Sequence, residues 1–136
     1  MALDIHENNK TGLDSSLTVT FPTNTFIINM RITLNLTHHC AEELIINVMA
    51  PSTKRLNLAD SKEYCNLDPG GMLKTSWSST STTPINNGTS PCTGTFKAEA
   101  ILFPGSADAD RNAVVSNVQQ WNLLYDQTIG NWTLKL

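Results

Sequence analysis

Three oxygen-bearing side chains at alternate positions, Asp108, Asp110 and Asn112, have the spacing that best fits a chemical role. Carboxylate and amide oxygens at alternate positions are typical of loops that bind calcium. However, the sixth position of this segment is Ala113, where such a loop has glycine, and the twelfth is Gln119, where it has glutamate. Aspartate also favours ordinary turns. We therefore expect an Asp-rich turn, with a calcium site as the alternative and no other cofactor.

The three histidines, His6, His38 and His39, do not form a recognisable catalytic set. A serine hydrolase needs a histidine beside a nucleophile and a carboxylate, and none of these histidines lies in a Gly-x-Ser-x-Gly turn. His38 and Cys40 lie two positions apart, with no third partner for thiol chemistry. The adjacent donors of residues 38–43 converge at most in pairs, which disfavours a zinc site. We predict a protein that is not an enzyme.

Trp77 lies inside a serine- and threonine-rich stretch, residues 75–83. Exposed aromatic rings offer a ligand a large contact area at low entropic cost. The sequence therefore makes Trp77 a candidate glycan-binding residue on a long exposed loop over residues 66–95, and the alternative is a solvated loop without a ligand. Trp121 and Trp132 are expected in the core.

The elements that would position these residues are strands, because apolar and polar side chains alternate with period two. The longest alternation runs over residues 28–37, and a second one over residues 44–48 ends before Pro51. These two strands are expected to form a hairpin or to be sheet neighbours. Residues 112–125 fit either a helical face or an extended chain. Further strands are predicted at residues 17–21, 54–58, 96–102 and 130–136.

These elements predict one all-β domain over residues 16–136, a jelly-roll-like antiparallel β-sandwich. Residues 1–15 are interpreted as an N-terminal arm, and residues 66–95 as a long irregular loop inserted in the sandwich. A chain of 136 residues is long enough for a single domain with a substantial core.

The composition limits the classes of partner. Charged residues make up 15% of the chain, the formal net charge is -3, and no basic cluster is present, which argues against a nucleic-acid partner. Neither a transmembrane run nor the apolar segment of a classical signal peptide is found, so membrane insertion is not predicted. Three cysteines cannot all pair within one chain, and free thiols are favoured over one internal disulfide.

Several segments carry motifs of one known family, in that family's order: Ser16-Leu17-Thr18-Val19, Ile32 to His38, Glu43 to Ser52, Gly94-Thr95-Phe96 and Gly130 to Lys135. Together they resemble the P domain that follows the catalytic domain in proprotein convertases and in many secreted bacterial subtilisin-like proteases. The chain departs from the family at Ala41-Glu42-Glu43-Leu44, where the family has Gly-Asp-Leu, and at Gly130-Asn131, which inverts the family's Asn-Gly. The resemblance implies a jelly-roll β-sandwich with an accessory, non-catalytic role, and some such domains bind calcium.

Two functional interpretations follow from these features. The first is a structural or interaction protein of a virion, such as a phage capsid decoration, cement or tail component. In this role the arm would lie on a neighbour, and copies would form a homo-oligomer with closed symmetry. The alternative is a carbohydrate- or protein-binding accessory module of a secreted protease or a cell-surface system, acting through residues 66–95. The expected partners are protein subunits, with a glycan as the alternative, in a virion or outside the cell.

Overall fold

The computed structural model describes residues 13–22, 25–37, 44–59, 71–85, 92–100 and 118–136, and these residues are almost all strands and connections. The elements are β1 (Asp14–Val19), β2 (Arg31–Thr37), β3 (Ile46–Met49), β4 (Arg55–Ala59), β5 (Gly71–Ser78), β6 (Cys92–Phe96), a 3-10 helix (Trp121–Leu124) and β7 (Gly130–Lys135). The prediction of an all-β fold is therefore confirmed.

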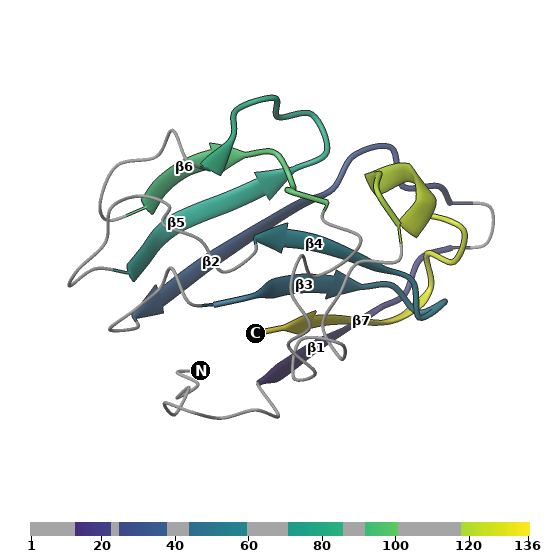
Figure 1. Cartoon of the computed structure of the whole chain (residues 1–136). Helices are drawn as coiled ribbons and strands as arrows, with labels where there is room; N and C mark the ends of the chain where they lie inside the picture. The colour runs from purple at the N-terminus through teal and green to yellow at the C-terminus, as the bar shows by residue number, and fades with distance from the viewer. Residues whose placement is uncertain (1–12, 23–24, 38–43, 60–70, 86–91, 101–117) are drawn as a thin grey trace, which may run out of the picture.

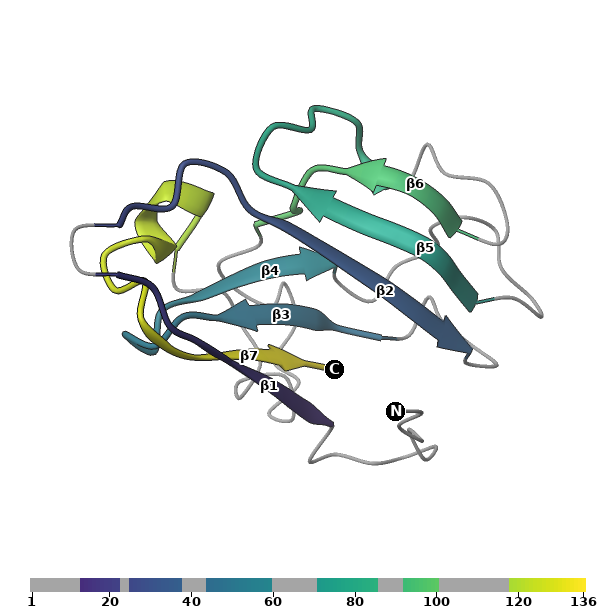
Figure 2. The ribbon, with the colours of Figure 1, turned by 180° about the vertical axis from the view of Figure 1, so that it is seen from behind.

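The strands form two sheets that enclose one core (Figure 1). A four-stranded sheet has the order β1-β7-β3-β4, and a three-stranded sheet has the order β2-β5-β6. Figure 2 shows the same two sheets from behind. Every pair in the four-stranded sheet is antiparallel, as is β2–β5, but β5 and β6 run parallel. The β-sandwich prediction is confirmed, the wholly antiparallel arrangement is wrong at β5–β6, and the jelly-roll connectivity stays a prediction.

The core is built from apolar side chains on the facing sides of the two sheets. Leu56 and Leu58 of β4 have no exposed surface, and neither have Ile46 of β3 and Trp77 of β5. Burial of such side chains removes apolar area from water, the dominant favourable contribution to folding. The predicted strand over residues 54–58 is thus confirmed as β4, with its leucines inward.

The predicted pairing of the two longest alternating segments is wrong. Residues 31–37 form β2 in the three-stranded sheet, whereas β3 lies between β4 and β7 in the other sheet. Period-two alternation shows which face of a strand is buried but does not name the neighbouring strand, which explains the error. The alternation also continues into Ile28, yet this side chain is 84% exposed because the chain is not in a strand there.

The segment predicted as a long irregular loop, residues 66–95, contains β5 and most of β6. The prediction failed because residues 75–78 of β5 are all buried, so this part of the strand does not alternate. Its hydroxyl groups are satisfied instead by hydrogen bonds. Thr75 donates to the carbonyl of Cys92, and the hydroxyl oxygens of Thr33 and Ser76 lie 2.7 Å apart.

Other boundaries also differ from the sequence interpretation. β1 begins at Asp14, so Asp14 and Ser15, assigned to the arm, pair with β7; residues 1–12 lie outside the described residues. The predicted strand over residues 96–102 is wrong for residues 97–100, which are not in a strand, because β6 ends at Phe96; residues 101–102 lie outside the described residues. Part of the ambiguous segment 112–125 is the short 3-10 helix, whereas the closing strand is confirmed as β7.

Candidate interaction surface

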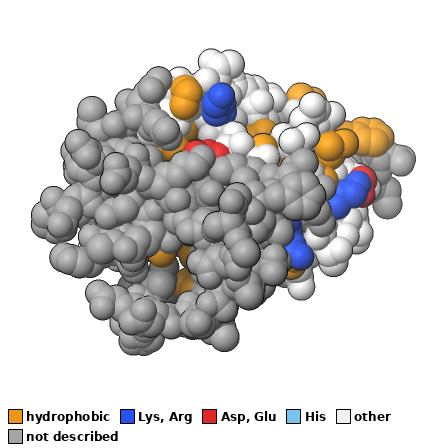
Figure 3. Space-filling model, viewed as in Figure 1, with side chains coloured by type: hydrophobic (Ala, Val, Ile, Leu, Met, Phe, Trp, Pro, Cys, Tyr) orange, Lys and Arg blue, Asp and Glu red, His pale blue; other side chains and the backbone are white. Residues whose placement is uncertain are grey.

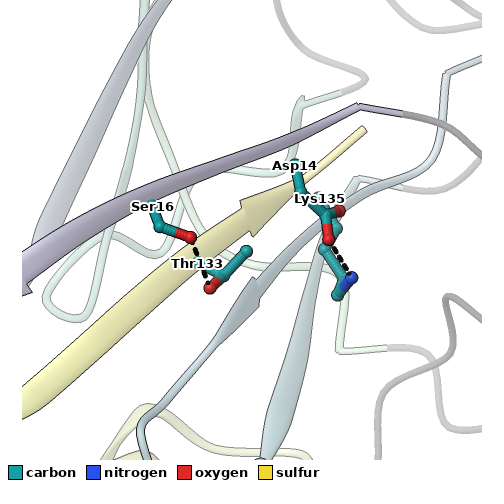
Figure 4. Close-up of polar contacts among 4 residues, drawn as sticks. All are labelled: Asp14, Ser16, Thr133 and Lys135. Atoms are coloured by element: carbon teal, nitrogen blue, oxygen red, sulfur yellow. Dashed lines mark hydrogen bonds and ion pairs between the residues drawn. The ribbon is translucent and has the colours of Figure 1, made fainter.

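The first component of the candidate surface is β1, an edge strand held to β7 by a ladder of polar side chains (Figure 4). Lys135 Nζ lies 2.6 Å from Asp14 Oδ2, and the hydroxyl oxygens of Ser16 and Thr133 lie 2.9 Å apart. Farther along the strand, Thr18 donates to Asn131 Oδ1 at 2.7 Å. These contacts lie on one face of β1, because alternate residues of a strand share a face.

Hydrogen-bonded and non-hydrogen-bonded residue pairs alternate along β1 and β7, and this alternation determines which backbone groups of β1 point outward. Leu13 and Leu136 exchange two backbone hydrogen bonds, of 2.8 and 2.9 Å. In an antiparallel pair such hydrogen-bonded positions alternate with non-hydrogen-bonded ones. Ser15 and Leu17 therefore direct their N–H and C=O groups toward β7. Those of Asp14, Ser16 and Thr18 point away from the sheet, and within the described part of the chain no partner meets them.

The second component is a set of exposed apolar side chains at one end of the sandwich. We call it the apolar end surface, and it comprises Phe21, Phe26, Ile28, Leu123 and Ile129. Figure 1 places the β1–β2 connection and the 3-10 helix at the same end, and Figure 3 shows exposed apolar side chains there. Phe26 and Ile28 are the most exposed, at 81% and 84%. Scattered exposed apolar residues are ordinary, whereas a group of them at one end is a candidate surface for a partner.

A charged contact fixes the turns beside this surface. Lys54 Nζ lies 2.7 Å from Asp126 Oδ2, and the Ser52 hydroxyl donates to Asp126 Oδ1 at 3.0 Å. The hydrogen bond from Lys54 is the largest cause of the lowered pKa of Asp126. Partial desolvation opposes it, and the contact with Ser52 lowers the pKa further to a smaller extent. The contact ties the turn after β3 to the segment that follows the 3-10 helix.

The residue predicted to bind a glycan is not on the surface. Trp77 lies in β5 with 0% of its surface exposed, opposite Ile32 of β2 and beside Phe96 of β6. The prediction that Trp77 is an exposed binding residue is therefore wrong, because burial between the sheets leaves no face for a sugar to stack on. Trp132 is buried, as predicted, whereas Trp121 is only partly buried against the core.

The candidate calcium ligands Asp108, Asp110 and Asn112 lie outside the described residues, so the calcium site stays a prediction. The segment 38–43 and His6 lie outside them as well. Across the residues that the structure does describe, no group of three or more His, Cys, Asp or Glu side chains is placed to hold a metal ion.

Sequence reasoning missed a buried polar pair, Asn47 of β3 and Asn57 of β4, which face each other in the ladder. Asn57 Nδ2 donates to the Ala59 carbonyl at 3.0 Å, but in the described structure neither amide atom of Asn47 has a hydrogen-bond partner. Both residues are at most 3% exposed. Alternation between apolar neighbours predicted that they face solvent, so no sequence signal marked them.

Cys92 corrects a further expectation. It is fully buried at the start of β6 and disulfide-bonded, and its partner lies outside the described residues. The preference for free thiols was therefore wrong for this cysteine. The odd number of cysteines gave no indication of which one is bonded.

Comparisons with known proteins do not assign the chain to a family. No family model, curated protein or solved structure matches the chain. The resemblance to the P domain therefore stays a prediction. In the part of the chain that the structure describes, no helix has both the length and the apolar character needed to cross a membrane.

Proposed function

We propose that this chain is a non-catalytic structural or interaction protein that works as a subunit of a larger assembly. The observation that carries the proposal is the apolar end surface, together with the outer edge of β1, which pairs with no other described strand. Large apolar side chains that are 81% and 84% exposed become favourable contacts once a partner removes them from water. A virion component, such as a phage capsid decoration, cement or tail protein, is the setting that fits this surface and the Thr- and Asn-rich composition best.

The polar ladder of β1 supports an assembly role in a second way. Its hydroxyl and amide contacts hold the edge strand in a fixed geometry without a large apolar face. A fixed edge strand is a template for pairing with another chain. Copies of the chain are therefore proposed to form a homo-oligomer, within a virion or outside the cell.

The alternative function, a carbohydrate- or protein-binding accessory module, divides into two cases. The glycan case depended on Trp77, whose burial removes its named contact residue. The protein-binding case is compatible with the apolar end surface, and a P-domain-like accessory role beside a protease remains its proposed form.

The proposal is tested by changing the two most exposed apolar side chains together, as Phe26→Ser with Ile28→Thr. The association constant of the assembly is expected to fall by at least about tenfold, because each large side chain gains about 1.5–3 kcal/mol on burial. The matched control is Asn29→Ser, an exposed polar change between them. Association is measured by native mass spectrometry and folding by thermal melting. Unchanged association of the double variant would refute the role of this surface.

A further inference from the structure

Edge strands of the two sheets differ in how they are protected against pairing. The outer edge of β4 is covered, because the N–H groups of Glu99 and Ala100 donate to its carbonyls at 3.2 and 3.0 Å. β2 begins with Arg31 and its pairing with β5 contains a register shift, and on β6 the carbonyl of Thr95 accepts a hydrogen bond from Ser81. Charges, bulges and covering segments are the usual ways to block an edge.

Within the described parts of the chain, β1 shows none of these protections. Its six residues pair with β7 without a register shift, and its only charged side chain, Asp14, is engaged by Lys135. The outward N–H and C=O groups of Ser16 and Thr18 meet no partner among the described residues. Leu17, between them, is 68% exposed although it lies on the same face as the buried Trp132 opposite it. A regular edge of this kind, whose single charged side chain is already paired, is suited to accept another strand.

We infer that β1 pairs with β1 of a second copy of this chain, antiparallel, about a two-fold axis that passes beside Leu17. This inference rests on the proposed function and names the contact by which copies would associate. The contact extends the four-stranded sheet of one copy directly into that of the other. An isologous contact of this type is the commonest basis of a symmetric dimer.

The alternation of inward and outward backbone groups along β1 restricts which residues of the two copies can lie opposite one another. Because the outward groups belong to even-numbered residues, a two-fold pair must place even-numbered residues opposite one another. An axis at Leu17 places Ser16 opposite the partner's Thr18, and Leu17 opposite the partner's Leu17. An axis at Ser16 would place Leu17 opposite the partner's Ser15. An axis at Thr18 would leave fewer residues of β1 paired with β1 of the second copy. The axis at Leu17 therefore buries the most exposed apolar side chain of the strand.

Charge is compatible with this register. Asp14, the only charged residue of β1, would lie opposite the partner's Thr20, so no like charges meet. Asp14 also keeps its ion pair with Lys135, on the opposite side from the new strand. The contact is thus self-complementary. Pairing between two identical copies requires this property, whereas pairing with an unrelated charged segment would not.

A cysteine at the axis tests the register directly. In non-hydrogen-bonded antiparallel pairs the Cα atoms lie about 4.5 Å apart, a separation that a disulfide can bridge. Leu17→Cys is expected to form a covalent dimer under mild oxidation at least about tenfold faster than Ser16→Cys or Thr18→Cys, whose partners in this register are not themselves. The unaltered chain measures the background from its own cysteines. Faster cross-linking of either control variant would overturn the register.

A matched pair of variants tests the edge itself. Ser16→Pro removes an outward N–H, which the pairing with β7 does not use, whereas Ser16→Ala keeps it. Both lose the hydroxyl contact with Thr133. Dimer measured by native mass spectrometry is expected to fall at least about tenfold in Ser16→Pro relative to Ser16→Ala. Equal dimer in the two variants, with both folded by thermal melting, would overturn the inference.

The outcomes separate this inference from the proposed function. Rapid cross-linking at Leu17 supports both. Assembly of the unaltered chain without cross-linking at Leu17 above background would overturn the β1 contact and leave the assembly role standing. A chain that stays monomeric and does not cross-link would remove both.

Discussion

Ser16 of β1 lies directly opposite Thr133 of β7, with the two hydroxyl oxygens 2.9 Å apart (Figure 4). The contact joins residues 117 positions apart in the sequence, so it exists only once the first and last described strands have met. Thr133 is 7% exposed whereas Ser16 is exposed, so the contact is only partly shielded from water. β1, the edge strand on which the proposed assembly contact depends, is therefore held in place by β7.

Removing this contact is expected to loosen β1 without unfolding the core. Ser16→Ala with Thr133→Val should show a coupling energy of about 0.2–1 kcal/mol in a double-mutant cycle, the range for cross-strand pairs. The free energy of unfolding is measured by denaturant titration of the two single variants and the double variant. Strictly additive losses would show that the two hydroxyl groups do not interact.

Trp77 is expected to be essential for stability. Trp77→Ala should lower the free energy of unfolding by about 3–5 kcal/mol, because a fully buried ring leaves a cavity between the sheets. Phe26→Ala is the control, since the side chain of Phe26 is 81% exposed and its loss should cost at most about 0.5 kcal/mol. Equal melting temperatures for the two variants would contradict the burial of Trp77.

Gly130, at the start of β7, is expected to resist any side chain. Its φ is 133°, and an added Cβ would lie 2.9 Å from Cβ of Pro51. Gly130→Ala should therefore destabilise the protein by about 1–3 kcal/mol through backbone strain and the clash. Thermal melting compares it with Asn131→Ala, a change at the next, exposed position. A Gly130→Ala variant as stable as this control would show that the strand can shift there without cost.

The pH dependence of Asp126 should reveal its contact with Lys54. The folded-state pKa of Asp126 is lowered, so the stabilisation that it gives is present above its unfolded-state pKa and is lost as the pH falls through the folded-state pKa. Lys54→Met should move the pKa of Asp126 back up toward the ordinary aspartate value. Carboxyl-carbon NMR titration of the two proteins measures this shift. An unchanged pKa in Lys54→Met would mean that Lys54 is not its main cause.

The sequence predicted the fold class because apolar and polar residues alternate along several strands. The alternation of Ile32, Leu34 and Leu36 marked β2, and the leucines of residues 54–58 marked β4. It failed at β5, where residues 75–78 are all buried and the hydroxyl side chains resemble a loop in composition. Strand partners were also mispredicted, because period-two patterns carry no information about which strands pair.

The candidate surface was less predictable than the fold. Phe26 and Ile28 continue the apolar pattern of β2, so the sequence placed Ile28 on the buried face, and only the structure shows that both are exposed. Which backbone groups of β1 point outward depends on which residue pairs of β1 and β7 are hydrogen-bonded, and the side-chain sequence does not indicate this. Trp77 was misassigned for the same reason as β5, since its neighbours are serine and threonine.

The mass of the native species, as isolated from its source, tests the central proposal most directly. Native mass spectrometry or particle imaging should find many copies of the 14.9 kDa chain in one symmetric assembly, held through the apolar end surface and the edge of β1. A free species of 14.9 kDa at the concentrations found in the source would contradict the assembly role.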